Sequence, residues 1–270
     1  MNNNELKLNA VDILLILALS VLAQFVTMVL TLPAKIFHFD EFLLMPIAEI
    51  ALYAATFAAY YFLVMKPRNQ VFRFRFAPKQ IGLFPVVILM FTGMIIVAES
   101  VISLMPDDGV FFGKLHQLMS DALWGNFERH PLITIFLAAI LAPVLEELFF
   151  RGLILKGLLN NNVKPVWAIV VSAAIFGGVH IFPWQVVGGF LAGLILGLVF
   201  YKTGTLFWGI ILHVFNNLSG IILYIRYGGE ETSEIFHFNS TLYFSTGLIL
   251  LLIFGYLYLK FTKNHQWNSY

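Results

Sequence analysis

Long apolar windows constrain the fold of this chain more than any other feature. Each is about 20 residues long, which is the length a helix needs to cross the hydrocarbon core of a bilayer. The chain is 60% hydrophobic and 11% charged, whereas soluble domains are roughly 45–50% apolar and 25% charged. We therefore predict an all-α polytopic membrane protein, a bundle of about eight transmembrane helices. The windows are residues 13–32, 42–65, 83–105, 131–150 or beyond, 165–182, 184–201, 206–224 and 242–259.

The order of the windows predicts one membrane domain over residues 1–270. The first window is longer than the apolar core of a signal peptide, and we interpret it as a retained span. With the N-terminus in the cytoplasm, the positive-inside rule is obeyed, because 12 of the 16 basic residues fall on inside segments. The prediction is an integral multi-pass protein with both termini cytoplasmic. Acidic residues then gather on the outer loops, including Glu230, Glu231 and Glu234.

The loop after the third window, residues 109–130, alternates apolar and polar side chains at a roughly helical period. This pattern predicts an interfacial helix between helices three and four. It could act as a gate, but an inert anchor at the membrane surface is the simpler interpretation.

Charge and cysteine content exclude several functions. A net charge of +1 over 270 residues argues against nucleic acid as a partner. The chain has no cysteine, so thiolate catalysis and cysteine metal ligands are unavailable. The partners that remain are the lipid bilayer and a peptide or membrane-protein substrate.

Charged residues occur inside the fourth window, where each is costly in lipid. Glu147 and Arg151 are four positions apart on one helix face, so they can form an ion pair. Glu146 lies about 100° further around that helix, and no basic residue stands three or four positions from it. An intramembrane carboxylate of this kind is a candidate functional residue.

Two further windows carry polar residues at helical spacing. Phe176 and His180 share one face, and His213 and Asn217 share another. Together with Glu146 they supply a carboxylate, two imidazoles and a carboxamide, which cover the general base, proton shuttle and oxyanion donor needed for water attack on an amide. Glu49 and Glu99 are also intramembrane carboxylates, and we interpret them as structural or cavity-facing.

These motifs resemble the CPBP family of intramembrane proteases, also called the CAAX protease and bacteriocin-processing or Abi family. The first signature appears as Glu146-Glu147-Leu-Phe-Phe-Arg151, the second as Phe176-Gly-Gly-Val-His180 and the third as His213-Val-Phe-Asn216-Asn217. The likeness covers residues 131–220, about one third of the chain, and the remaining windows match only as hydrophobic spans.

The resemblance implies an eight-helix intramembrane endopeptidase that cuts membrane-associated peptides or prenylated C-termini near the membrane surface. Carried over by motif position, Glu146 and His180 would activate the attacking water, and His213 and Asn217 would stabilise the oxyanion. Glu147, Arg151 and Phe176 would support the site structurally.

Metal dependence has two interpretations. Glu146, His180 and His213 could bind zinc with an open position for water. However, that arrangement leaves no second carboxylate as base except Glu147, which is expected to pair with Arg151. We therefore favour a metal-free glutamate mechanism without a cofactor.

Two other functions stay open: a non-catalytic membrane scaffold or regulator that binds a partner membrane protein, and a small transporter with a proton relay. Glu146 and His180 are predicted at different depths in the membrane. Glu146 lies toward the inner half of its window and His180 near the outer end of the next, so we expect the fourth helix to continue to about Leu159 and the turn at Phe182 to be sunk below the surface.

Overall fold

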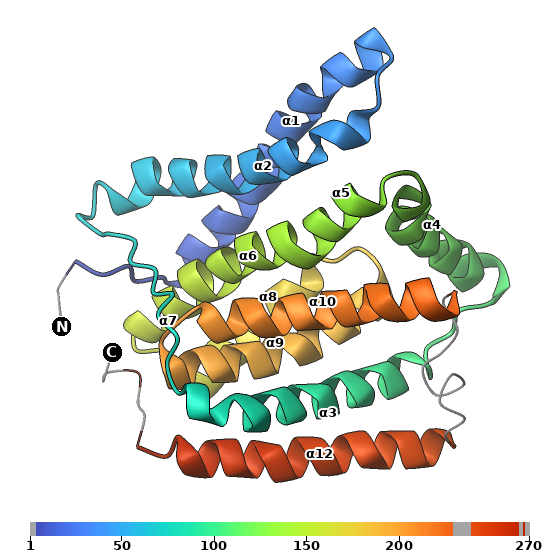
Figure 1. Cartoon of the computed structure of the whole chain (residues 1–270). Coiled ribbons are helices and arrows are strands. Elements are labelled where there is room, and N and C mark those ends of the chain that lie inside the picture. Colours follow the sequence, from blue (N-terminus) through green and yellow to red (C-terminus); the bar gives the residue numbers. More distant parts are fainter. Residues whose placement is uncertain (1–3, 229–238, 265–266, 268–270) are drawn as a thin grey trace. The chain divides into compact units, whose positions relative to one another are not determined.

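The computed structural model describes residues 4–228, 239–264 and 267. All regular structure in this part of the chain is helical (Figure 1), which confirms the predicted all-α class. Among the described residues, seven helical runs are long and apolar enough to cross a membrane, so the protein is a polytopic membrane protein. Those runs are Ala10–Ala34, Glu41–Met65, Ile81–Ile102, Pro131–Asn160, Pro183–Thr203, Phe207–Tyr227 and Ser240–Phe261.

The fifth predicted window forms a shorter helix than expected, α8 (Pro165–Gly178). Its 14 residues rise about 21 Å, which is less than the ~30 Å thickness of the hydrocarbon core. The helix ends at Gly178, and His180 lies in the turn that follows. The depth of this turn in the membrane stays a prediction. Three of the acidic residues assigned to the outer loops, Glu230, Glu231 and Glu234, lie outside the described residues.

The chain divides into two compact units. The first unit comprises residues 1–74 and 126–168, and the second comprises residues 75–125 and 169–270. The expectation of one membrane domain over 1–270 stays a prediction.

In the first unit, α1 (Ala10–Phe37) packs on a run formed by η1 (Glu41–Leu44), α2 (Met45–Tyr60) and η2 (Tyr61–Met65). Asn9 and Asp12 form a capping box that begins α1. Asp12 also accepts hydrogen bonds of 2.9 and 3.0 Å from Nη1 of Arg68, in the loop after η2. This bond raises the pKa of the Arg68 guanidinium and fixes the end of η2 beside the start of α1.

The other long run of the first unit, residues 131–160, joins α5 (Pro131–Ile135), η5 (Phe136–Leu141), α6 (Ala142–Glu146), η6 (Glu147–Leu155) and α7 (Lys156–Asn160). The fourth helix therefore continues to Asn160, as expected. The N-terminal segment is tied to its end, because the side-chain amide of Asn160 donates to the carbonyl oxygen of Leu6 at 2.9 Å. The carbonyl oxygen of Gly157 in turn accepts a hydrogen bond from the backbone N–H of Leu8.

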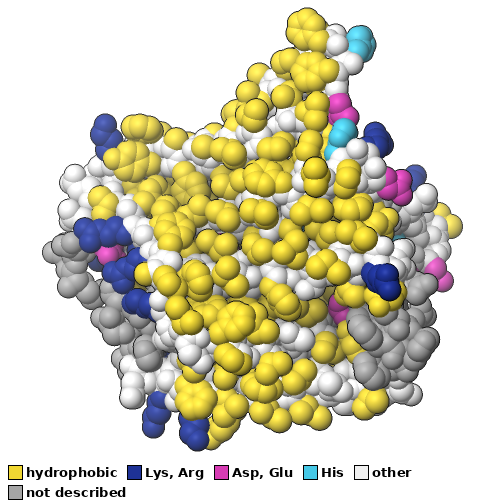
Figure 2. All heavy atoms as spheres, in the orientation of Figure 1, with side chains coloured by type: hydrophobic (Ala, Val, Ile, Leu, Met, Phe, Trp, Pro, Cys, Tyr) yellow, Lys and Arg dark blue, Asp and Glu magenta, His cyan; other side chains and the backbone are white. Residues whose placement is uncertain are grey.

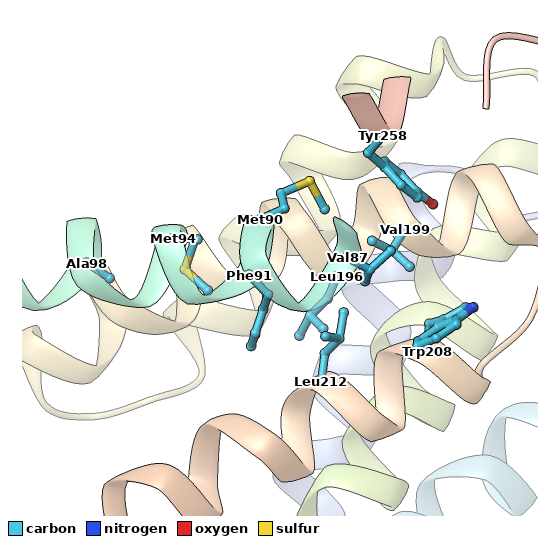
Figure 3. Packing of buried hydrophobic residues seen from close by; sticks show 10 residues of the cluster. All are labelled: Val87, Met90, Phe91, Met94, Ala98, Leu196, Val199, Trp208, Leu212 and Tyr258. Carbon is cyan, nitrogen blue, oxygen red and sulfur yellow. The ribbon is translucent and has the colours of Figure 1, made fainter. Parts of the chain in front are cut away.

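The second unit has a hydrophobic core at the junction of four helices (Figure 3): α3 (Phe84–Ile102), α9 (Pro183–Thr203), α10 (Phe207–Tyr227) and α12 (Ser240–Phe261). Trp208 of α10 is fully buried there, and its Nε1 donates to the carbonyl oxygen of Lys79 at 2.6 Å. The indole therefore joins the core to the loop that precedes α3. The buried members of the cluster are Val87, Met90, Phe91, Met94, Ala98, Leu196, Val199, Trp208, Leu212 and Tyr258.

Helices α3 and α12 lie side by side (Figure 1) and approach closely at two glycines. A Cβ atom added at Gly93 would lie 2.5 Å from the backbone nitrogen of Leu251. A Cβ added at Gly247 would lie 2.5 Å from Cγ2 of Ile96. Small residues at such crossings are typical of helix packing in membranes, where backbone proximity maximises van der Waals contact.

Basic residues gather at one end of each unit. In the second unit, hydrogen bonds from Gln80 to the carbonyl oxygen of Lys202 and from Lys202 to that of Thr262 bring together the start of α3 and the ends of α9 and α12. Figure 2 shows hydrophobic side chains over much of the visible surface, with few charged side chains among them. This distribution is typical of a surface that contacts lipid. The basic residues at these ends are Lys66, Arg68, Arg73, Lys156 and Lys164 in the first unit, and Arg75, Lys79, Lys202, Lys260 and Lys263 in the second.

The segment predicted as interfacial is helical, over η4 (Gly109–Gly113) and α4 (Lys114–Arg129). The ring of Trp124 stacks on Tyr224, near the end of α10, with centroids 3.6 Å apart. His116 contacts Trp184 at the start of α9, with centroids 5.1 Å apart. The helix is confirmed, and its position at the membrane surface stays a prediction.

Candidate active site

Glu146 is the last residue of α6, near the middle of the 30-residue run Pro131–Asn160. Its side chain is half-buried. The helix around it is irregular, because Pro143 lacks an N–H and its ring would clash with the carbonyl of residue 139 in an α-helix. The π-helical segments η5 and η6 flank α6 on both sides. Such segments are often found at functional sites.

Glu147 and Arg151 form the ion pair that their spacing predicts. Nη1 of Arg151 donates to Oε1 of Glu147 at 2.7 Å, and both side chains are fully buried. The two opposite charges compensate each other, which is the condition for keeping charges buried. Glu147 is therefore held in a fully buried ion pair, whereas the adjacent Glu146 is only half-buried.

In the second unit, Phe176 brings the two candidate imidazoles together. Its ring meets His180 edge-on at 5.4 Å and His213 edge-on at 5.5 Å between centroids. Phe176 and His213 are buried, whereas His180 is half-buried. The two histidines, one in the turn after α8 and one in α10, therefore both contact the same aromatic ring.

The hydrogen bond of His180 defines its tautomer. Nδ1–H donates to the backbone carbonyl oxygen of Phe176 at 2.8 Å. A carbonyl oxygen only accepts, so in the neutral ring the proton is on Nδ1 and Nε2 is the acceptor. Nε2 is thus the nitrogen able to take a proton from water.

Asn217 is oriented by its neighbour Asn216. The side-chain nitrogen of Asn216 donates to Oδ1 of Asn217 at 3.0 Å. This bond uses the oxygen of the Asn217 carboxamide, so its nitrogen is the group suited to donate to a substrate oxygen. The motif gives Asn216 no role of its own, although the sequence places it next to Asn217.

The candidate residues divide between the two units. Glu146, Glu147 and Arg151 belong to the first, and Phe176, His180, His213 and Asn217 to the second. Within the second unit the structure brings His180 and His213 together around Phe176. The convergence of Glu146 with these histidines stays a prediction, as do the roles of all the site residues.

Metal binding also stays a prediction. Within the described ranges, no three His, Asp or Glu side chains are grouped closely enough to hold a metal ion. The zinc alternative would combine Glu146, His180 and His213 from both units.

Comparison with known families agrees with the sequence motifs. Residues 128–219 match the family model described as Rce1-like, type II CAAX prenyl endopeptidase Rce1-like. This match confirms the resemblance to the CAAX protease family and supports a CAAX-type intramembrane endopeptidase in general terms. Neither the search of curated proteins nor that of solved structures gave a significant match.

Proposed function

We propose, because residues 128–219 match the Rce1-like family model, that the chain hydrolyses peptide bonds of membrane-associated peptides or prenylated C-termini by a metal-free mechanism. Glu146 takes a proton from water with His180, and the water oxygen attacks the carbonyl carbon. His213 and Asn217 donate hydrogen bonds to the oxyanion. The proton then passes to the amide nitrogen as the C–N bond breaks.

One observation carries this proposal: a single buried ring, Phe176, holds His180 and His213 side by side while His180 keeps Nε2 as its acceptor nitrogen. A base and an oxyanion donor have to act on the same carbonyl group, so they have to be neighbours. Two imidazoles serving only as separate interhelical contacts would not need this arrangement.

Helix lengths support the inclusion of Glu146. Glu146 lies 14 residues before Asn160, the end of its run at the basic end of the first unit. His180 lies 15 residues after Pro165, where α8 begins. Both positions therefore rise by about 20 Å along their own helices, and these similar rises support the inclusion of Glu146 in the proposal.

The test uses purified protein in liposomes with a quenched fluorescent peptide, in prenylated and unprenylated forms. We expect the wild type to cleave the peptide, and Glu146→Gln and His180→Ala to lose cleavage while keeping the wild-type melting temperature. A Glu146→Gln protein with full activity would contradict the mechanism. A folded wild type that cleaves neither peptide, but whose Glu146→Gln form supports the cellular phenotype, would favour the scaffold alternative.

We also propose that the basic ends of both units, and with them the chain termini, face the cytoplasm. The positive-inside distribution supports this orientation. The chain has no cysteine, so single-cysteine variants give an unambiguous test. A membrane-impermeant maleimide should label Asp107→Cys in intact cells and Asn69→Cys only after permeabilisation; the reverse pattern would overturn the orientation.

A further inference from the structure

Glu49 is an intramembrane carboxylate whose role the motifs do not explain. It lies in α2, is half-buried and belongs to the apolar run Glu41–Met65. A structural carboxylate should show an ion pair or a hydrogen bond, as Glu99 does by accepting a hydrogen bond from the hydroxyl of Tyr243. Glu49 shows neither with the described residues, and it interacts electrostatically with Glu146.

The packing of the first unit explains why these two carboxylates are close. Helix α2 and the run Pro131–Asn160 are parallel, because Asp40 and His130 join their starts at 2.5 Å and Lys156 donates to Arg73 near their ends. The ring of Tyr53 meets Phe149 edge-on at 5.6 Å. Glu49 stands four residues before Tyr53, and Glu146 three residues before Phe149, so both lie one turn before this contact. Figure 1 shows α2 and α6 side by side.

A peptide that enters an apolar site brings backbone N–H groups that have to be satisfied there. Leaving one without an acceptor costs free energy comparable to a lost hydrogen bond. We propose that Glu49 is a substrate-binding residue: its carboxyl oxygen accepts a hydrogen bond from a backbone N–H of the bound peptide beside the bond attacked by the Glu146-activated water. This inference rests on the proposed function and adds the α2 side of the site to it.

Stability separates this role from a structural one. A carboxylate among apolar side chains that lacks a protein partner destabilises the folded state. Replacing Glu49 by leucine should therefore leave the melting temperature unchanged or raise it, as is common when a functional residue is removed. Replacing Glu99 by leucine, the matched control, removes a hydrogen-bonded carboxylate and should lower the melting temperature.

The experiment measures kcat, KM and melting temperature for wild type, Glu49→Leu, Glu49→Gln, Glu99→Leu and Glu146→Gln with the prenylated peptide. We expect Glu49→Leu to raise KM roughly five- to tenfold, the equivalent of one hydrogen bond. Glu49→Gln should keep a near wild-type KM, because its amide oxygen still accepts. Glu99→Leu should keep the wild-type KM despite its lower stability.

The outcomes separate this inference from the proposed function. If Glu146→Gln loses activity while Glu49→Leu keeps the wild-type KM, the role of Glu49 alone is overturned. A Glu49→Leu protein that fails to fold would show a structural role and overturn it equally. Absence of hydrolysis in the folded wild type would overturn both.

Discussion

Nη1 of Arg151 donates to Oε1 of Glu147 at 2.7 Å in a part of the helix where both side chains are at most 1% exposed. Removing one partner from a buried pair leaves the other charge uncompensated. We therefore expect Glu147→Ala and Arg151→Ala each to lower the free energy of unfolding by about 3–5 kcal/mol. Thermal unfolding in detergent measures this change.

The paired replacement Glu147→Leu with Arg151→Met is the matched control for this ion pair. It removes both charges and fills the same space with apolar atoms, so it should be far less destabilising than either single change. If the double variant is as unstable as the singles, the pair contributes packing geometry that apolar residues cannot replace.

The sequence predicted the helices well because hydropathy directly reports which segments can lie in lipid. It also predicted the Glu147–Arg151 pair, since residues four apart on one helix are neighbours whatever the rest of the fold does. The continuation of the fourth helix to Asn160 followed from the leucines after Arg151.

Other features could not be predicted because they depend on contacts between distant segments. The π-helical segments on either side of Pro143 have no hydropathy signal. The early end of α8 at Gly178 lies inside an apolar window that continues to residue 182. The proximity of Glu49 to Glu146 depends on the parallel packing of α2, and the rings of Tyr53 and Phe149 that set its register are 96 positions apart in the chain.

The close crossing of α3 and α12 predicts different outcomes for two glycines of the same helix. In Gly247→Ala, the new Cβ would lie 2.5 and 2.7 Å from two atoms of Ile96, so the helices have to separate at a cost of about 1–3 kcal/mol. At Gly255 an added Cβ meets nothing within 4 Å. Gly255→Ala should thus be neutral or stabilise the helix by up to about 1 kcal/mol. Equal melting temperatures for the two variants would contradict the packing.

The link between Asp40 and His130 should respond to pH. The backbone N–H of Phe42, followed by the side chain of His130, lowers the pKa of the Asp40 carboxyl. Because the pKa of Asp40 is lower in the folded state, its carboxylate stabilises the fold at pH values above its unfolded-state pKa of about 3.9. This stabilisation is lost as the pH falls through the folded-state pKa. Asp40→Asn should flatten this acid dependence of the melting temperature, and an unchanged pH profile would contradict it.

A metal-free mechanism predicts that chelators leave cleavage unchanged. Incubation with 1,10-phenanthroline or EDTA, followed by the fluorescent-peptide assay in liposomes, tests it. Loss of activity that added zinc restores would favour the zinc alternative with Glu146, His180 and His213 as ligands. Loss that zinc does not restore, and that a non-chelating phenanthroline isomer also causes, would indicate disturbance of the membrane instead.

The two adjacent asparagines of α10 should differ in their effect on catalysis. Asn217 donates to the oxyanion in the proposed mechanism, and removal of one such donor typically lowers kcat by about 10²–10³-fold. Asn216 only orients the Asn217 carboxamide through the 3.0 Å bond to its oxygen, so Asn216→Ala should retain the donor in a less fixed position and lose roughly tenfold in kcat. KM should change little in both variants, because the oxyanion exists only after attack. A raised KM with unchanged kcat in Asn217→Ala would instead assign this side chain to binding the substrate in its ground state.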